Sequence, residues 1–346
     1  MAATARSAWG LSAVLALALI ASLAAAASIG VAGLSLGTVW QVVADHLGLA
    51  AADVSALTDA IVWEIRVPRV LTAAAVGAGL AIAGVVMQAL TRNPLADPYL
   101  LGLSSGASLG AVGVLLLGLG SAVALSVALP AAAFAGALLA LAASLAIARA
   151  AGAIGPATVV LAGLAVSQFF AALTSLVIFL TAQGDSYRQV LAWLLGSLAG
   201  STWTTVVVAA AALAVVLPLV VAWASRLDAF ALGDTAAQAL GFSVRATRLA
   251  LFVAVSLLTG AMVSASGAIG FVGLILPHLV RGLTGGIHRR LVPAAALGGA
   301  VFLVWADTLA RTIVDPRELP VGVVTAVIGV PAFVIVLVRA RRRRAS

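Results

Sequence analysis

The sequence predicts an all-α integral membrane protein whose ten transmembrane helices form one bundle. Three observations predict it: 64% of the 346 residues are hydrophobic, the mean hydropathy is +1.22, and only 9% of the residues are charged. A soluble chain carries about 25% charged residues and uses them to cover its surface. A soluble enzyme, a nucleic-acid-binding protein and a disordered chain are therefore excluded for the chain as a whole.

Ten apolar stretches approach the roughly 20 residues that a helix needs to cross a bilayer. In order they cover 8–34, 67–90, 99–120, 125–148, 157–182, 203–225, 247–266, 271–282, 291–311 and 320–339. The eighth is short and contains Pro277. The first begins like a signal peptide, but its apolar run is longer than the usual h-region, which favours a retained span.

The arginines orient these spans. All 19 basic residues are arginine, and a topology with both termini in the cytoplasm places 14 of them on the inner side. Because cytoplasmic loops carry an excess of positive charge, we expect this orientation. Residues 1–346 then form a single transmembrane domain, with 226–245 as a cytoplasmic loop and 340–346 as a basic cytoplasmic tail.

Side chains that could catalyse a reaction or carry an ion are scarce. The chain has no lysine for a Walker-type phosphate loop, no cysteine for thiol chemistry or thiolate metal sites, and three histidines without metal-ligand spacing. Asp307 is the only acid inside a predicted span, which argues against proton coupling, although sodium coupling through backbone carbonyls stays open. We expect no catalytic residue, cofactor or metal in this chain, and energy for any transport from another subunit.

The inner loop 226–245 predicts two short helices, the first over 228–232 and the second over 235–240. Gly233 and Gly241 would end them, and Asp234 or Thr235 would cap the second. Their apolar side chains would be exposed to water, which favours docking on a partner over lying on the membrane surface. These side chains are Phe230, Leu232, Leu240 and Phe242.

Two other segments depart from the general pattern. The inner loop 92–98 reads Arg-Asn-Pro-Leu-Ala-Asp-Pro, a tight reversal stiffened by two prolines, which suits a gate or a contact surface. On the outer side Arg66, Arg69 and Arg311 oppose the charge bias. Interfacial snorkelling could explain one of them, whereas three together predict an acidic partner that approaches from outside.

Small residues are abundant, with 34 glycines in the chain. Gly106/Gly110 and Gly196/Gly200 have the GxxxG spacing that allows helices to approach closely. Residues 76–84 also resemble 259–267, in segments of opposite predicted direction. An inverted repeat of the transporter kind would produce such an echo.

Several of these motifs together resemble the signature of the FecCD-type, BtuC-like permeases, the membrane subunits of bacterial ABC importers for iron-siderophores, haem and cobalamin. The resemblance runs in consistent order from about residue 60 to the C-terminus. It is carried by Arg66-Val-Pro-Arg69, Gly-Ala-Gly-Leu-Ala (77–81), Gln88, Arg-Asn-Pro-Leu-Ala-Asp-Pro (92–98), Gly-Phe-Val-Gly-Leu-Ile-Leu-Pro-His-Leu-Val-Arg (270–281) and Glu-Leu-Pro-Val-Gly-Val-Val-Thr-Ala (318–326).

The resemblance implies a ten-helix permease of a type II ABC importer in the bacterial inner membrane. Its partners would be a second permease, identical or different, two ATPase subunits that bind ATP and magnesium, and an extracytoplasmic solute-binding protein. The fifth and tenth spans would line the pathway, with a short outer helix near 188–200.

The resemblance also assigns roles to individual residues. Arg66, Arg69 and Arg311 match positions that dock the binding protein, and Asn93 and Leu95 match the cytoplasmic gate. The positions that contact the ATPase are matched by Leu232, Gly233, Asp234, Ala237, Leu240 and Gly241.

For the substrate, the resemblance implies a bulky metal chelate, and we expect a ferric siderophore. Haem and cobalamin are the alternatives within the same family. An ion-coupled secondary transporter and a membrane receptor or scaffold without conduction are the alternatives outside it.

Overall fold

The computed structural model describes residues 2–30, 33–51, 53–119, 125–152, 155–314 and 317–345, and all regular secondary structure within these ranges is helical. By length and composition, seven of the described helices could cross a membrane, and three shorter apolar helices bring the number to ten. The ten spans predicted from hydropathy are therefore confirmed. The ten helices are α1 (Ala2–Ser28), α4 (Val67–Thr91), α5 (Leu103–Leu117), α6 (Leu125–Ala150), α7 (Pro156–Thr181), α9 (Trp203–Ala222), α12 (Val244–Ser266), α13 (Val272–Thr284), α14 (His288–Ala310) and α15 (Val321–Ala345).

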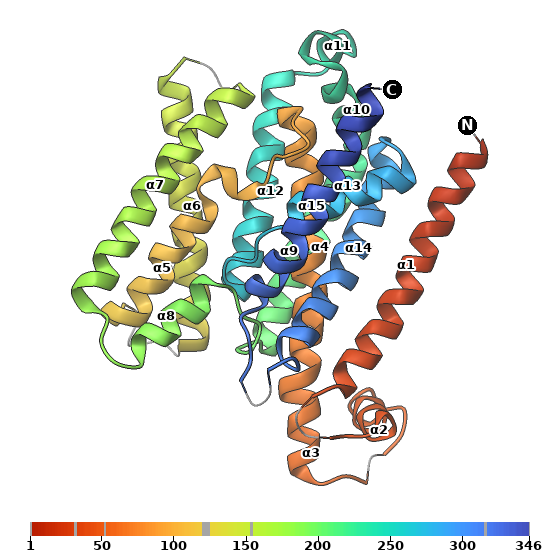
Figure 1. Cartoon of the computed structure of the whole chain (residues 1–346), viewed down its shortest axis with the longest axis vertical. Coiled ribbons are helices and arrows are strands. Elements are labelled where there is room, and N and C mark those ends of the chain that lie inside the picture. Colours follow the sequence, from red (N-terminus) through yellow and green to blue (C-terminus); the bar gives the residue numbers. More distant parts are fainter. Residues whose placement is uncertain are drawn as a thin grey trace.

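The bundle has two distinct ends (Figure 1). Both termini lie at one end, together with the short helices α10 (Ala224–Leu232) and α11 (Asp234–Ala239). We call it the α11 end. The opposite end, which we call the α3 end, carries α2 (Leu36–His46), α3 (Ala56–Ala60) and α8 (Ser186–Leu194). The basic tail 340–346 belongs to α15 as far as Ala345, and its side chains lie outside the described part of the structure.

Helix α4 is the centre of the bundle, and almost every residue from Pro68 to Leu90 is buried. Its most extensive contacts are with α14, followed by α12, α9 and α13. Glycines make this packing close: a Cβ on Gly77 would lie 2.2 Å from the carbonyl oxygen of Gly299, and one on Gly84 would overlap the backbone of Gly273. The helices therefore touch backbone to backbone, as small residues permit.

One of the two predicted GxxxG pairs packs two helices together. Gly106 and Gly110 of α5 lie against α6, where Gly136 approaches the backbone of Gly106 in return. The other prediction was wrong. Gly196 and Gly200 follow the last residue of α8, and Gly196 adopts a positive φ of 79° that turns the chain out of the helix.

The α3 end contains a feature that hydropathy did not predict. Helix α2 is short and amphipathic, and α3 continues through a π-helical turn, Ile61–Arg66, into α4. The ring of His46 stacks on Trp63 at 4.1 Å and bonds to Asp59, and the Trp63 carbonyl accepts a hydrogen bond from the Trp203 indole. These contacts fasten the α2–α3 segment to the helices beneath it.

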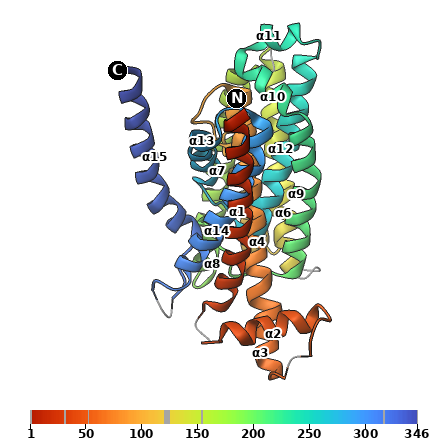
Figure 2. The same cartoon turned by 90° about the vertical axis from the view of Figure 1, so that its right-hand side faces the viewer.

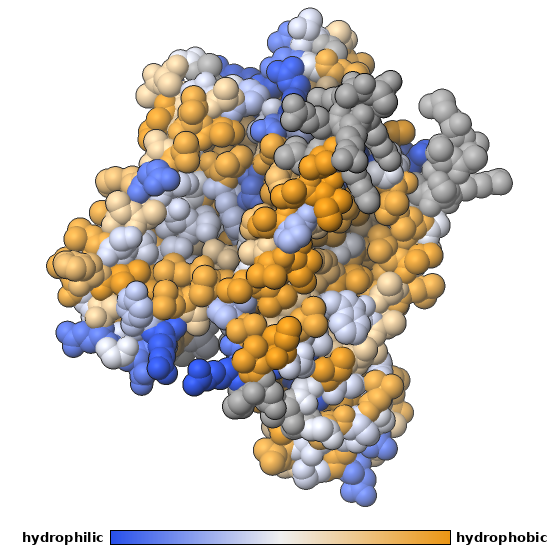
Figure 3. Space-filling view, viewed as in Figure 1, coloured by the Kyte–Doolittle hydropathy of each residue, from blue (hydrophilic) through white to orange (hydrophobic). Residues whose placement is uncertain are grey.

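Helix α15 stands away from the rest of the bundle when the molecule is seen from the side (Figure 2). It contacts mainly α14 and α13, and it leaves Val327, Val334 and Ile335 at least half exposed. Hydrophobic surface covers most of the middle of the molecule, and hydrophilic groups gather toward the two ends (Figure 3). Such an apolar belt is expected of a helical bundle that lies in a bilayer.

Candidate functional site

The loop at the α11 end contains the two short helices that its sequence predicts. Gly233, with φ 108°, separates α10 from α11, and Gly241, with φ 82°, follows α11. The predicted side-chain cap was wrong, because Gly233 occupies the N-cap position and no side chain caps the helix. Asp234 instead accepts a hydrogen bond of 2.6 Å from Arg248 of α12.

The apolar side chains of this loop divide into two groups. Phe230 is fully buried, packs edge-on against Phe242, and lies under the Arg248 guanidinium at 5.2 Å. In contrast, Leu232 is 77% exposed and Leu240 is 66% exposed. The loop is therefore braced from within while two large apolar side chains point outward, as a docking surface requires.

A second contact joins the loop to α14. The Asp228 carboxylate accepts hydrogen bonds from the backbone N–H of His288 at 3.0 Å and from its ring Nδ1 at 2.6 Å. Burial raises the pKa of Asp228, but the hydrogen bonds and charge of His288 outweigh it and hold that pKa below its usual value. The first residue of α14 is thus fixed to α10.

The loop 92–98 lies beside these helices at the α11 end. Arg92, in the left-handed region at φ 52°, ends α4, and Asn93 Oδ1 accepts a hydrogen bond from the backbone of Leu95. Both Asn93 and Leu95 are exposed. Asp97 caps the 3-10 turn η2 (Pro98–Leu101) by accepting from the backbone N–H of Tyr99. The loop is a fixed reversal with its tip free, which is the form that the two prolines predict.

A groove of about 300 Å³ separates this loop from α7. In its wall, the Tyr99 hydroxyl donates a hydrogen bond to the Ile269 carbonyl at 2.9 Å. Phe271, with φ 70°, directly precedes the first residue of α13 there. The groove brings residues of the fifth predicted span next to the loop 92–98. Its lining is Asp97, Tyr99, Leu100, Leu164, Ser167, Gly270, Phe271 and Leu274.

Arg66, Arg69 and Arg311, which the charge bias predicts to lie on the outer side, cluster near the α3 end, but they are buried, at 5–6% exposure. Arg69 forms three hydrogen bonds of 2.9–3.1 Å with Asp307 and two of 2.9–3.0 Å with Glu318. Arg66 donates to the carbonyls of Ala27 and Ser28, and Arg311 donates to that of Ala26. The cluster that the motif predicts therefore exists, and its first partners belong to the same chain.

Asp307 and Glu318 are the partners of Arg69 that the motif analysis did not connect with the arginines. Asp307 is 1% exposed, whereas the Glu318 side chain is 41% exposed. Asp307 was noticed as the only acid inside a predicted span, and its isolation there is the one signal that a buried cation must lie opposite. No group of three or more potential metal ligands occurs among the described residues.

Comparison with known proteins identifies the family. The model of the FecCD transport family matches residues 15–339. The chain belongs to the FecCD transport family. It is 43% identical over 282 residues to the Fe(3+) dicitrate transport system permease protein FecD of Escherichia coli, covering 81% of this chain and 86% of that one. It is 38% identical over 324 residues to the hemin transport system permease protein HmuU of Yersinia pestis, covering 92% of each.

A solved structure agrees with this assignment. A chain described as a metal-chelate type ABC transporter in an inward-facing conformation matches with a TM-score of 0.82 and 28% identity, over 95% of this chain and 99% of the other. The FecCD chain is thus a membrane-spanning permease subunit of a bacterial ABC importer for metal chelates. Its relatives are the permease subunits of these importers and not their ATPases.

Proposed function

We propose that this permease carries a ferric siderophore into the cytoplasm, in complex with a second permease, two ATPase subunits and an extracytoplasmic binding protein. The α11 end faces the cytoplasm, since that orientation places most of the arginines inside. The observation that carries the proposal is the braced loop α10–α11 with Leu232 and Leu240 exposed at its surface in a chain of the FecCD family.

The ATPase subunits dock on this loop, through Leu232, Gly233, Asp234, Ala237, Leu240 and Gly241. The ATPases bind ATP and magnesium, and this chain adds no catalytic residue to them. When they close, they displace α10 and α11. The Asp234–Arg248 pair passes the displacement to α12, and the Asp228–His288 pair passes it to α14. A buried or half-buried charged contact transmits such a movement because breaking it would leave a charge without a partner.

At the other end, Arg66, Arg69 and Arg311 receive acidic residues of the binding protein. Glu318 occupies one side of the Arg69 guanidinium and is itself 41% exposed. An incoming carboxylate therefore replaces or joins Glu318 rather than meeting a free cation. Asp307, being buried, keeps Arg69 in place throughout.

The pathway runs between α7 and α15, with Asn93 and Leu95 as the gate on the cytoplasmic side. Both helices leave large apolar side chains exposed, such as Phe179 at 85% and Val327 at 68%. The groove beside Tyr99 opens against α7, and the standing-off α15 (Figure 2) provides a surface for the second permease.

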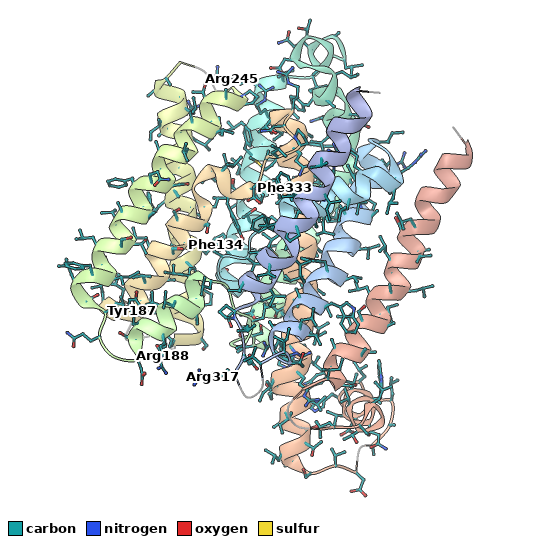
Figure 4. The ribbon with its side chains drawn as sticks, viewed as in Figure 1. Phe134, Tyr187, Arg188, Arg245, Arg317 and Phe333 are labelled. Carbon is teal, nitrogen blue, oxygen red and sulfur yellow. The ribbon has the colours of Figure 1, made fainter. Side chains whose placement is uncertain are left out.

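Two exposed arginines favour an anionic iron chelate among the possible substrates. Arg188 of α8 and Arg317, which precedes α15, are both exposed, and both are seen toward the α3 end of the molecule (Figure 4). Cations at a pathway opening raise the local concentration of anions. An iron chelate is also named for the 43% identical relative. Haem and cobalamin are the alternatives that the uptake experiment tests.

Ion coupling receives less support than ATP coupling. Asp307, the one acid inside a predicted span, is held by Arg69 with three hydrogen bonds and is 1% exposed. A carboxylate engaged in this way is a poor proton carrier, because protonation would leave the arginine charge buried and uncompensated.

The test is uptake into proteoliposomes that contain this chain with its ATPase, its second permease and its binding protein. Ferric siderophore, haem and cobalamin, each radiolabelled, are supplied outside in parallel, with and without internal ATP. ATP-dependent accumulation of the ferric siderophore alone is the expected result. Accumulation of only haem or only cobalamin would contradict the substrate, and uptake that persists without the ATPase would contradict the coupling.

A further inference from the structure

A second pocket lies inside the α11 end, beneath the α10–α11 loop. It has a volume of about 290 Å³ and lies where the end of α4, the loop 92–98, α10, the end of α13 and the start of α14 meet. Four of its lining residues carry polar side chains, namely Gln88, Arg92, Arg281 and His288; the others are Ala89, Pro94, Ala231 and Gly286. It shares no lining residue with the groove beside α7.

Two buried polar atoms of this lining have no hydrogen-bond partner among the described residues. They are Oε1 of Gln88 and Nε2 of His288, and each side chain belongs to a residue that is 3% exposed. A buried polar group without a partner costs roughly 1–3 kcal/mol, so two of them in one pocket point to a ligand that completes them.

The orientation of both groups follows from their other hydrogen bonds. Gln88 Nε2 donates to the Leu274 carbonyl at 3.1 Å, which places the amide oxygen, an acceptor, on the other side. His288 Nδ1 lies 2.6 Å from the Asp228 carboxylate and therefore carries a proton. Because Nδ1 is engaged by Asp228, Nε2 is the ring nitrogen that is left for a ligand in the pocket.

The charge of the pocket is positive. Arg92 and Arg281 form no ion pair and no side-chain hydrogen bond with any described residue, and no acid belongs to the lining. Asp228, which contacts the lining residue His288, is already bonded to it. A ligand that satisfies this set needs anionic oxygens for the guanidinium groups, an O–H donor for Gln88 Oε1 and a polar group for His288 Nε2.

We propose that this pocket binds a hydrogen phosphate group. A carboxylate has no O–H to donate to Gln88, and sulfate has none at neutral pH. Inorganic phosphate keeps at least one O–H as its monoanion or dianion, and a phosphomonoester keeps one as its monoanion. Bidentate pairing of guanidinium with phosphate supplies the charge-assisted bonds. The phosphate arrives either as free inorganic phosphate from the cytoplasm or as the phosphomonoester headgroup of a lipid.

The position gives such a ligand influence over transport. Bound phosphate bridges Arg92, the first residue of the loop 92–98 that carries the proposed gate, to Arg281 and to the start of α14. Arg92 also lies near the α10–α11 loop, since its Nη1 is 3.5 Å from the position that a Cβ of Gly233 would occupy. Phosphate in the pocket therefore connects the loop 92–98 to α14 and α10.

The experiment is calorimetric titration of the full chain, in phosphatidylcholine nanodiscs, with inorganic phosphate and separately with sulfate. We expect saturable phosphate binding that is at least about tenfold tighter than sulfate binding, because a site built around an acceptor rejects a ligand that lacks the donor. Arg281→Gln and Arg92→Gln should each weaken phosphate binding about tenfold.

Arg245→Gln is the matched control, because Arg245 is exposed at the same end of the molecule and lies outside the pocket (Figure 4). It should leave phosphate binding unchanged. No phosphate binding up to about 10 mM, equal binding of sulfate and phosphate, or an equal loss in the control variant would each overturn the proposal. The comparison of phosphate with sulfate uses the unaltered chain, so it stands even if a variant fails to fold.

A further arm distinguishes the two sources. Nanodiscs that contain phosphatidic acid should weaken the apparent binding of inorganic phosphate if the lipid headgroup reaches the pocket. Unchanged binding assigns the pocket to free phosphate.

Discussion

The contact between α4 and α14 offers the sharpest test of the packing. At their crossing, Gly77 and Gly299 face each other. A Cβ added to Gly299 would lie 2.3 Å from the Gly77 carbonyl oxygen and 2.7 Å from the Ala81 side chain. Ordinary contacts begin at 3.4 Å, so Gly299→Ala forces the two helices apart by about 1 Å. Backbone atoms on the other side cannot move aside by a side-chain rotation.

Overpacking of a well-packed core costs about 1–3 kcal/mol, and we expect the upper end here because α4 is buried along nearly its whole length. The matched control is the neighbouring substitution Gly298→Ala. Its Cβ would meet only Val280 and Leu276, at 3.5 and 3.7 Å. Replacing a helical glycine there gains up to about 1 kcal/mol in helix propensity.

The assay is thermal unfolding of the two variants and the unaltered chain in nanodiscs, followed by circular dichroism. Gly299→Ala should melt well below the unaltered chain, while Gly298→Ala should melt at or slightly above it. Identical melting of the two variants would refute the close crossing. So would a larger loss at position 298 than at 299.

Three further predictions follow from the site. Leu240→Asp should abolish ATP-dependent uptake while membrane insertion stays normal, because it places a charge on the surface proposed to contact the ATPase; normal uptake would contradict that docking. Asp307→Asn should lower the free energy of unfolding by about 3 kcal/mol, because it leaves the buried Arg69 charge partly unpaired. The control Asp59→Asn, at a half-exposed pair, should change the free energy of unfolding by less than about 1 kcal/mol. Equal losses in the two variants would argue against the buried pair. Burial, opposed by a backbone hydrogen bond, raises the pKa of Asp97 from 3.8 to about 6, so the contribution of Asp97 to stability falls as the pH rises from about 4 to about 6. The difference in melting temperature between the unaltered chain and Asp97→Asn should therefore decrease over this pH range. A constant difference would contradict the prediction.

The spans were predictable because hydropathy is a local property. A helix in a bilayer must be apolar along its whole length, so the pattern persists through breaks such as Pro277. Helix α2 was missed for the same reason, since it is amphipathic and short and carries no such continuous signal. The loop α10–α11 was predictable from its glycines, which end helices by their own conformational freedom.

The partners of charged residues could not be predicted in this way. Arg69 and Asp307 are 238 positions apart in sequence, and only the crossing of α4 with α14 brings them together. Asp234 looked like a helix cap because a cap is a local pattern, but Arg248 of α12 lies within reach in the folded chain and takes its carboxylate instead. Local rules describe where helices begin and end, whereas ion pairs depend on which helices become neighbours.

Helix α14 is held at both ends by charged contacts: His288, its first residue, binds Asp228, and Asp307, near its last, binds Arg69. At 1.5 Å per residue these two points are about 28 Å apart. A single helix thus spans the distance between the proposed ATPase surface and the proposed binding-protein surface. If each partner binds more tightly to one arrangement of the end of α14 that it contacts, binding of either partner changes the affinity of the chain for the other. The coupling free energy is the same in both directions. The binding protein would then sense the nucleotide state of the ATPases as strongly as the ATPases sense the binding protein.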